Sequence, residues 1–290
     1  MKELQPEAFS MRDRAPAFQQ TQTLGYNRCA LSGSELCSII RNEGTVTSRP
    51  PKIRRFARGE ILVDQGDIPN FLGVLQCGYV RQQRLRLNGN HIPFGLAFPG
   101  DVVGGVPGIN AGCALEASTD IEILTFDNMT VEHLMLKSPT FRQFILRETG
   151  RQHQRLLGSA WRRNALDSRE RIIAFLIDAT GLMPTSLQPD GSLIVQIEVS
   201  RRDWADLTNT AVETVSRTMR YLAEKELVAS LTPYKFHIRD LDQLAFLAGV
   251  KPPSQQKLRS DQLCLAKGFS VFPRSIKCET PQSVKVEILD

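Results

Sequence analysis

The sequence predicts an α+β protein with an N-terminal β-roll, one long helix and a C-terminal winged helix-turn-helix. Three observations support this. Short β-runs broken by glycine extend from about Ile53 to Ile123, a helical period follows Pro139, and a last region orders helix, strand, two helices and hairpin. The chain has 290 residues and a hydrophobic content of 41%, enough for two globular domains and a linker.

The predicted β-roll consists of short alternating runs at close, regular spacing. They are FARGEILVDQGD, FLGVLQCGYVRQQRLRL, HIPFGLAFPGDVVGG and ALEASTDIEILTF. Such spacing indicates a compact antiparallel barrel or roll. Asn88 and Gly89 predict a hairpin turn, because both residue types tolerate positive φ.

The helical period begins in TVEHLMLK and continues after Pro139, a residue suited to a first helical turn. Along this second helix, five residues follow one another at intervals of three and four, which is a heptad seam of the kind that pairs two helices. They are Leu146, Thr149, His153, Leu156 and Ala160. A helix lying on its own β-roll would carry an apolar stripe equally well. We expect self-association, and we expect His153 to be a hydrogen-bonded structural histidine rather than a pH sensor or haem ligand.

The third region begins at Leu166 with an amphipathic helix, DSRERIIAFLIDATGLM, that Asp167 or Ser168 is placed to cap. MPTSLQPDGS predicts a turn-rich loop and LIVQIEV a strand. The two helices that follow are joined by a tight turn, and a hairpin, VASLTPYKFHIRD, and a short helix end the region. In this order the elements form a winged helix.

The second of these two helices, VETVSRTMRYL, has two different faces. Polar residues gather within an arc of about 100°, whereas the opposite side is a core stripe. The polar side holds Glu213, Ser216, Arg217 and Arg220, and the apolar side holds Ala211, Val215, Met219 and Leu222.

The preceding helix, from Ser200 to about Leu207, contributes Trp204 and Leu207 to the core. The turn and an N-cap are expected from Thr208, Asn209 and Thr210. A helix framed in this way can enter the major groove of DNA.

In the major groove an arginine pairs with guanine, a carboxylate accepts from cytosine and a hydroxyl can meet thymine. We therefore expect Glu213, Ser216 and Arg217 to read bases, with Glu213 and Arg217 also orienting each other. The expected phosphate contacts are Arg201, Arg202 and Arg220. The alternative is a solvated helix face with an incidental Glu213–Arg217 pair.

Charge and composition agree with a DNA partner. The formal net charge is +5 and the sequence pI about 9.0. The N-terminus has no apolar signal region, and no apolar run approaches the roughly 20 residues that span a bilayer. We expect a cytoplasmic protein with no membrane contact. The four dispersed histidines form no HExxH motif and none lies near a GxSxG motif, so we expect no enzyme.

Together these segments resemble the CRP/FNR superfamily of bacterial transcription regulators. The resemblance covers most of residues 50–249, from RGEILVDQGD and PGDVVG through RERIIAFL to VETVSR and FHIRDLDQLAFLAG. It implies that the β-roll is of the cyclic-nucleotide-binding type and that Glu213, Ser216 and Arg217 read DNA. Val212 stands where cyclic-AMP receptor members usually have arginine, so the helix is closer to the FNR branch.

The resemblance also implies a homodimer that reads a TTGAT-like inverted repeat, with its recognition helices about one DNA turn apart. Such a dimer recruits RNA polymerase through exposed loops, and we expect it to act as an activator. Trp204 departs from the smaller aliphatic residue usual at its position. We expect this change to repack the core and leave DNA reading intact.

The signal is less well defined. Cyclic-nucleotide-binding members hold the cyclic phosphate with an arginine, and PGDVVGGVPGINAGCALEAS contains none, which argues against cyclic AMP. Leu156 stands where oxygen-sensing members place an acidic residue that opposes dimerisation. An apolar residue there favours a dimer without ligand, so control by abundance or by another signal is expected.

Oxygen-sensing members hold an iron–sulfur cluster with closely spaced N-terminal cysteines and one central cysteine. Here no CxxC precedes Cys29, and Ile121 stands at the central position. A cluster held by Cys29, Cys37, Cys77 and Cys113 is an alternative that we do not favour. With Cys264 and Cys278, these are expected to be ordinary thiols.

The expected organisation has five segments. They are an N-terminal arm over 1–48, a β-roll sensor domain over 49–137, a dimerisation helix over 138–165, a winged helix-turn-helix over 166–249 and a tail over 250–290. Two alternatives for the function stay open. One is a redox or oxygen sensor of the same fold that carries an iron–sulfur cluster or haem, and the other is a ligand-sensing module whose winged helix contacts only proteins.

Overall fold

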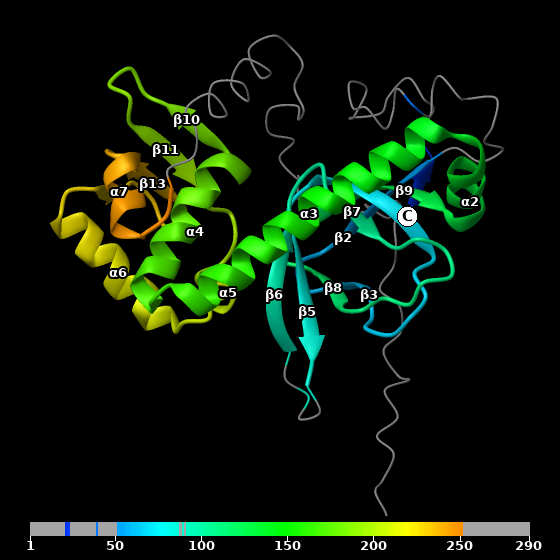
Figure 1. Ribbon diagram of the computed structural model, residues 1–290, viewed down its shortest axis with the longest axis horizontal. Coiled ribbons are helices and arrows are strands. Elements are labelled where there is room, and N and C mark those ends of the chain that lie inside the picture. The colour runs from blue at the N-terminus through cyan, green and yellow to red at the C-terminus, as the bar shows by residue number, and fades with distance from the viewer. Residues whose placement is uncertain (1–20, 24–38, 40–50, 87–88, 90, 252–290) are drawn as a thin grey trace, which may run out of the picture.

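The structure, a computed structural model, describes residues 21–23, 39, 51–86, 89 and 91–251. A β-roll and a winged helix-turn-helix lie at opposite ends of a long helix that runs between them (Figure 1). The predicted α+β class and the predicted order of the large elements are confirmed. Cys29, Cys37, Cys264, Cys278 and most of the predicted arm and tail lie outside the described residues.

The β-roll is built from two antiparallel sheets. One has the strand order β1-β2-β9-β4-β7 and the other β3-β8-β5-β6. The strands are β1 (Thr21–Thr23), β2 (Lys52–Phe56), β3 (Ile61–Val63), β4 (Phe71–Cys77), β5 (Val80–Leu85), β6 (His91–Ala97), β7 (Val102–Gly104), β8 (Ala114–Ala117) and β9 (Ile121–Asp127). Leu75, Val80 and Ile123 are fully buried between the sheets. Gly89, in the β5–β6 turn, has a φ of 81°, a conformation that suits the hairpin turn predicted there.

Two helices follow the roll, α2 (Asn128–Lys137) and α3 (Pro139–Ala165). Ser138 caps α3 by accepting a hydrogen bond from the Phe141 amide, and Pro139 occupies the first turn as predicted. Phe141, Phe144 and Ile145 are buried against the roll, so the first turns of α3 are part of its core. None of the helices in the described part of the chain is long and apolar enough to cross a membrane.

The winged helix begins directly after α3. Its elements are α4 (Ser168–Leu182), β10 (Thr185–Leu187), β11 (Leu193–Gln196), α5 (Arg201–Leu207), α6 (Val212–Glu224), β12 (Val228–Ser230), β13 (Lys235–Ile238) and α7 (Leu241–Leu247). Asp167 caps α4 in a reciprocal capping box with Glu170, as its sequence predicted. The strands form one sheet in the order β10-β11-β13-β12. The predicted turn-rich loop at MPTSLQPDGS is confirmed for its second half, where the Gly191 amide donates to the Gln188 carbonyl, and wrong for Thr185–Leu187, which form β10 and pair with β11.

The apolar core of the winged helix extends into the β-roll. Trp204, Phe236 and Ile172 are buried at its centre, and Tyr79 of the roll belongs to the same cluster. Tyr79 packs edge to face on Phe98, with ring centroids 5.9 Å apart. The two domains therefore share a packed apolar boundary as well as the covalent connection through α3.

Candidate DNA-binding surface

Helix α6 presents the predicted polar face to solvent. Its inner face packs into the winged-helix core through Val215, Thr218 and Leu222, which are all buried. The opposite face is exposed, and it carries Glu213, Ser216, Arg217 and Arg220. The face predicted to read bases is therefore open to a partner.

Three details of α6 and the turn before it differ from expectation. Ala211, expected in the core stripe, is exposed and is the N-cap residue, and no side chain caps the helix there. Thr208, expected to help to cap α6, instead donates its hydroxyl to the Trp204 carbonyl at 2.8 Å. No ion pair joins Glu213 to Arg217 within the described residues, so the expected mutual orientation is not seen. The start of α6 thus keeps uncapped backbone N–H groups, which suit a phosphate.

Arg171 on α4 holds the turn between α5 and α6, a role that the sequence did not suggest. Its Nε donates to the Thr208 carbonyl at 2.8 Å, and its guanidinium nitrogens donate to the carbonyls of Asn209 at 3.2 Å and Leu166 at 2.9 Å. Asn209 has a φ of 50°, in the left-handed region. One planar cation therefore satisfies two carbonyls of the α5–α6 turn and one carbonyl just before α4.

The three predicted phosphate contacts lie in different surroundings. Arg220 and Arg202 are exposed. Arg201 is half-buried, with its guanidinium 4.9 Å from the ring centroids of both Trp204 and Phe236. Burial lowers the pKa of Arg201, and its buried Nη1 has no hydrogen-bond partner within the described chain. Trp204 thus provides a stacking surface for this cation.

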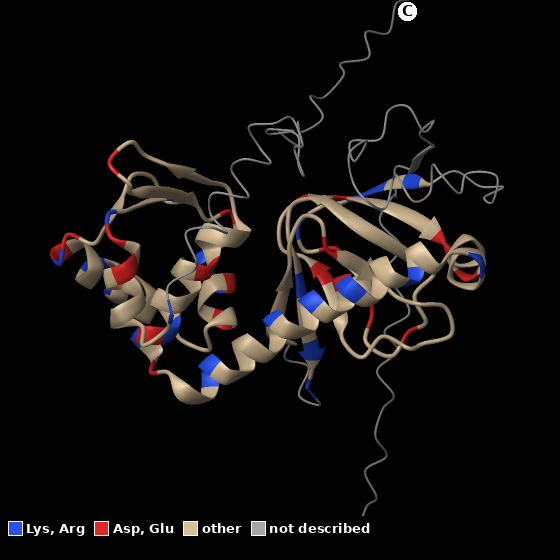
Figure 2. Cartoon of the chain, turned by 45° about the horizontal axis from the view of Figure 1, so that its top comes forward, with Lys and Arg blue, Asp and Glu red and all other residues tan. Residues whose placement is uncertain are grey.

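Basic residues also recur along α3 (Figure 2), but carboxylates pair with most of them. Arg155 pairs with Asp101 and Arg162 with Asp178, while Arg151 lies 3.1 Å from Glu148. Asp101, in the PGDVVG turn, also accepts from the Phe98 amide at 2.9 Å. Burial raises its pKa, which the charge of Arg155 opposes. Arg155 and Arg162 hold α3 to the rest of the chain, whereas the Arg151 pair lies within α3, and all three are poor candidates for DNA contacts.

The predicted seam of α3 is largely exposed, with one exception. Thr149, His153 and Ala160 are exposed, and Leu146 is 73% exposed. Leu156 is half-buried against Gly95 of β6, so it packs on its own roll. Leu157 and Trp161, which are about half exposed, complete the open stripe instead. His153 makes no hydrogen bond within the described residues, contrary to expectation.

The sensor half offers little to a cyclic nucleotide. The stretch Gly104–Cys113 supplies no cation of its own, and the nearby Arg84 is exposed and bonded to the Gly112 carbonyl at 3.1 Å. The carboxylate of Asp101 is already held by Arg155. This stretch therefore supplies no cation for a cyclic phosphate, and the expectation that cyclic AMP is not the signal stays a prediction.

Two of the weak cofactor candidates lie among the described residues. Cys77 and Cys113 are half-buried, and burial raises the pKa of the Cys113 thiol. Over the ranges that the structure describes, no three His, Cys, Asp or Glu side chains gather as metal ligands. The roles of Cys29 and Cys37 stay predictions, because both lie outside those ranges.

Comparisons with known proteins agree with this arrangement. Residues 53–138 match the family model for a cyclic nucleotide-binding domain, and residues 170–247 match the Crp-like helix-turn-helix domain. The chain is 28% identical over 182 residues to the nitrogen fixation regulation protein FixK of Rhizobium meliloti, covering 63% of this chain and 80% of that protein. It is 24% identical over 208 residues to the transcriptional activator protein FnrL of Cereibacter sphaeroides, covering 69% and 82%.

Solved structures share the fold. The structure of FixK2 from Bradyrhizobium japonicum superimposes with a TM-score of 0.62 at 17% identity, covering 70% of this chain and 98% of that one. Fold, matched domains and relatives define a DNA-binding transcription regulator with a cyclic-nucleotide-binding-type roll. With both domains matched in this order, the chain belongs to the CRP/FNR superfamily, which consists of transcription regulators.

The role of Arg171 can be tested by unfolding. Arg171→Lys is expected to lower the free energy of unfolding by about 1 to 3 kcal/mol, because one ammonium group cannot reach three carbonyls at once. Arg169→Lys is the matched control. Arg169 lies 4.3 Å from the ring centroid of Tyr221, a contact that lysine can keep. Urea unfolding followed by circular dichroism measures both, and equal losses would contradict the assignment to Arg171.

Proposed function

We propose that the protein is a cytoplasmic, sequence-specific transcription regulator that binds a TTGAT-like inverted repeat as a homodimer and activates transcription with RNA polymerase. The observation that carries this proposal is the exposed face of α6, on which Glu213, Ser216 and Arg217 lie opposite a fully buried inner face. A carboxylate, a hydroxyl and a guanidinium on one open helix face can distinguish bases in the major groove. An activating role is supported by the name of the relative FnrL.

Dimerisation through α3 is supported by its open stripe. Leu146, Leu157 and Trp161 are large apolar side chains that stay exposed in the single chain, and they recur on one side of α3. Because an apolar stripe of this kind is costly in water, a second copy of α3 is a suitable cover for it. The dimer needs no ligand in this proposal. A signal other than cyclic AMP is supported separately, because the stretch Gly104–Cys113 has no arginine to hold a cyclic phosphate.

The direct test is binding of the full chain to a duplex that contains the TTGAT inverted repeat. Fluorescence anisotropy should show tight binding that weakens as salt rises, because phosphate contacts release counterions. A duplex with scrambled half-sites should bind much more weakly. Equal binding to both duplexes would remove the sequence-specific proposal, and no binding to either would favour a winged helix that contacts only proteins.

Two variants should distinguish a residue that reads bases from one that contacts phosphates. Arg217→Ala is expected to cost about 1 to 3 kcal/mol at its guanine and to relax discrimination there. Arg202→Ala should weaken binding to all duplexes alike and reduce the salt slope by about one. The two variants are compared on a panel of duplexes with single base changes. Unchanged discrimination in Arg217→Ala would contradict its role.

The dimer seam can be tested with one charge. Leu157→Glu places a carboxylate next to its symmetry mate and is expected to shift the protein to monomers in sedimentation equilibrium. Leu136→Glu is the matched control, because Leu136 on α2 is 78% exposed and lies outside the stripe. A dimer that survives Leu157→Glu, or a wild-type protein that is monomeric, would contradict the seam.

A further inference from the structure

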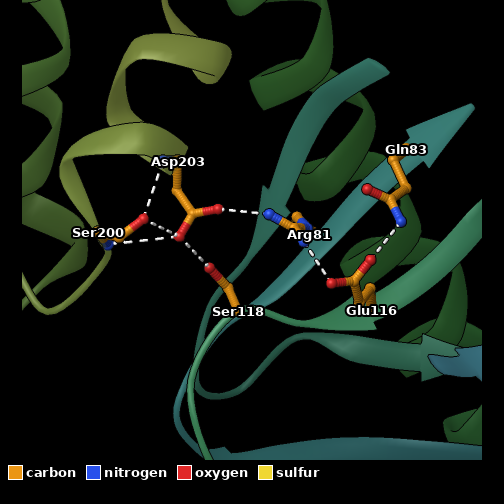
Figure 3. Close-up of polar contacts among 6 residues, drawn as sticks. All are labelled: Arg81, Gln83, Glu116, Ser118, Ser200 and Asp203. Carbon is orange, nitrogen blue, oxygen red and sulfur yellow. Dashed lines mark hydrogen bonds and ion pairs between the residues drawn. The ribbon is translucent and has the colours of Figure 1, made fainter. Parts of the chain in front are cut away.

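A network of charged and polar side chains joins the β-roll to α5, the first helix of the helix-turn-helix (Figure 3). Asp203 of α5 lies at its centre. Its Oδ1 accepts from Nη1 of Arg81 at 2.7 Å, and its Oδ2 accepts from the Ser118 hydroxyl at 2.9 Å. Arg81 also pairs with Glu116, whose other oxygen accepts from Gln83 at 2.5 Å. Arg81, Gln83, Glu116, Ser118 and Asp203 are called the Asp203 network below.

The Asp203 network includes a residue that caps the N-terminus of α5. Ser200 is the N-cap of α5, and Asp203 is its partner in a reciprocal capping box. Asp203 accepts from the Ser200 hydroxyl at 2.7 Å as well as from Arg81 and Ser118. The same carboxylate therefore starts the helix and fixes it to the roll.

Burial makes this contact specific. Asp203 and Ser118 are each 3% exposed, and Gln83 is 1% exposed. Burial alone would lower the pKa of Arg81, but its hydrogen bond and charge contact with Glu116, together with Asp203, raise it. A carboxylate buried in this way is stable only with its partners in place, so the network favours one arrangement of the two domains.

The surrounding boundary supports the same arrangement. The Tyr79 hydroxyl donates to Glu198 of the winged-helix region at 3.0 Å. Leu96 and Phe98 of the roll pack on the winged-helix core beside it. The strands that supply Arg81 and Glu116, β5 and β8, are neighbours in one sheet. A change in that sheet would therefore be felt directly at the start of α5.

The network does not cover the DNA-reading face. Glu213, Ser216 and Arg217 are exposed while Asp203 is hydrogen-bonded to Arg81 and Ser118. In the single chain the contact therefore leaves that face uncovered. The contact is suited to orienting α6 through α5.

We propose that the Asp203 network sets the direction in which each subunit presents α6, and that it thereby sets the spacing of half-sites that the dimer can bind. Arg81, Glu116 and Ser118 act as positioning residues for DNA binding. This proposal rests on the proposed function. Without the network, the two recognition helices would vary in relative position, and the preference for one spacing would weaken.

The experiment compares full-length wild-type protein with Arg81→Gln and Asp203→Asn, which break the central ion pair from either side. Asparagine keeps an acceptor for the capping box. Arg55→Gln is the matched control, because Arg55 lies 2.6 Å from Glu122 in an ion pair between β2 and β9, within the roll. Binding is measured on inverted repeats whose half-sites are moved apart or together by one or two base pairs, and on a single half-site.

The wild type and Arg55→Gln are expected to prefer one spacing clearly. Both network variants should bind that best duplex about tenfold more weakly, with a flattened spacing preference and an almost unchanged affinity for the single half-site. Ser118→Ala, which removes only a hydroxyl, should move in the same direction and carries the test if circular dichroism shows that a charge variant is unfolded.

Three results would overturn the proposal. A spacing preference in the variants equal to that of the wild type would show that the network does not orient α6. Tighter binding at every spacing would show that it restrains DNA binding instead. Absence of DNA binding by the wild type would remove the proposed function and this inference together, whereas the first two results leave the proposed function in place.

Discussion

The face that α6 offers to a partner is determined by the face that it buries. Val215 and Leu222 are fully buried, and the core that receives them is filled by Trp204, Phe236 and Ile172. Rotating the helix to present another side would expose these apolar side chains and bury arginines. The packing of the winged helix therefore comes first, and the arrangement of the outer polar residues follows from it.

The same logic extends from the winged helix to the whole chain. Tyr79 of the roll is buried in the winged-helix cluster, and Asp203 of α5 is held by the roll, so each domain completes the surface of the other. Arg155 fixes α3 to the PGDVVG turn through Asp101. The β-roll and the winged helix are thus connected through α3 and through a packed boundary. A change in the structure of one domain would therefore alter the position of the other.

Features that depend on neighbours in the sequence were predicted well. The cap at Asp167, Pro139 in the first turn of α3, the Gly89 turn and the two faces of α6 each follow from residues within a few positions of one another. The N-cap of α6 is the exception. There Thr208 hydrogen-bonds within its own turn, and Ala211 takes the cap position without a side-chain bond.

Features that depend on distant partners could not be predicted. In the sequence, Arg171 is an ordinary basic residue on an amphipathic helix. Its role depends on the carbonyls of Thr208 and Asn209, which only the tertiary fold places beside it. Asp203 lies three residues after Ser200, a spacing typical of a helix cap, whereas Arg81, with which it also pairs, lies 122 positions away in the sequence. Leu156 fits a heptad by spacing, but Gly95 leaves room for it on the roll. In each case the decisive contact arises only from the tertiary fold.

The central claim is that two copies of this chain read a repeated DNA sequence with the exposed face of α6. Selection of bound duplexes from a random pool by the full-length protein, followed by sequencing, tests it without assuming any half-site. We expect enrichment of an inverted repeat whose half-site centres lie about 10 base pairs apart. A pool without an enriched sequence, or one enriched in a single unrepeated site, would contradict it.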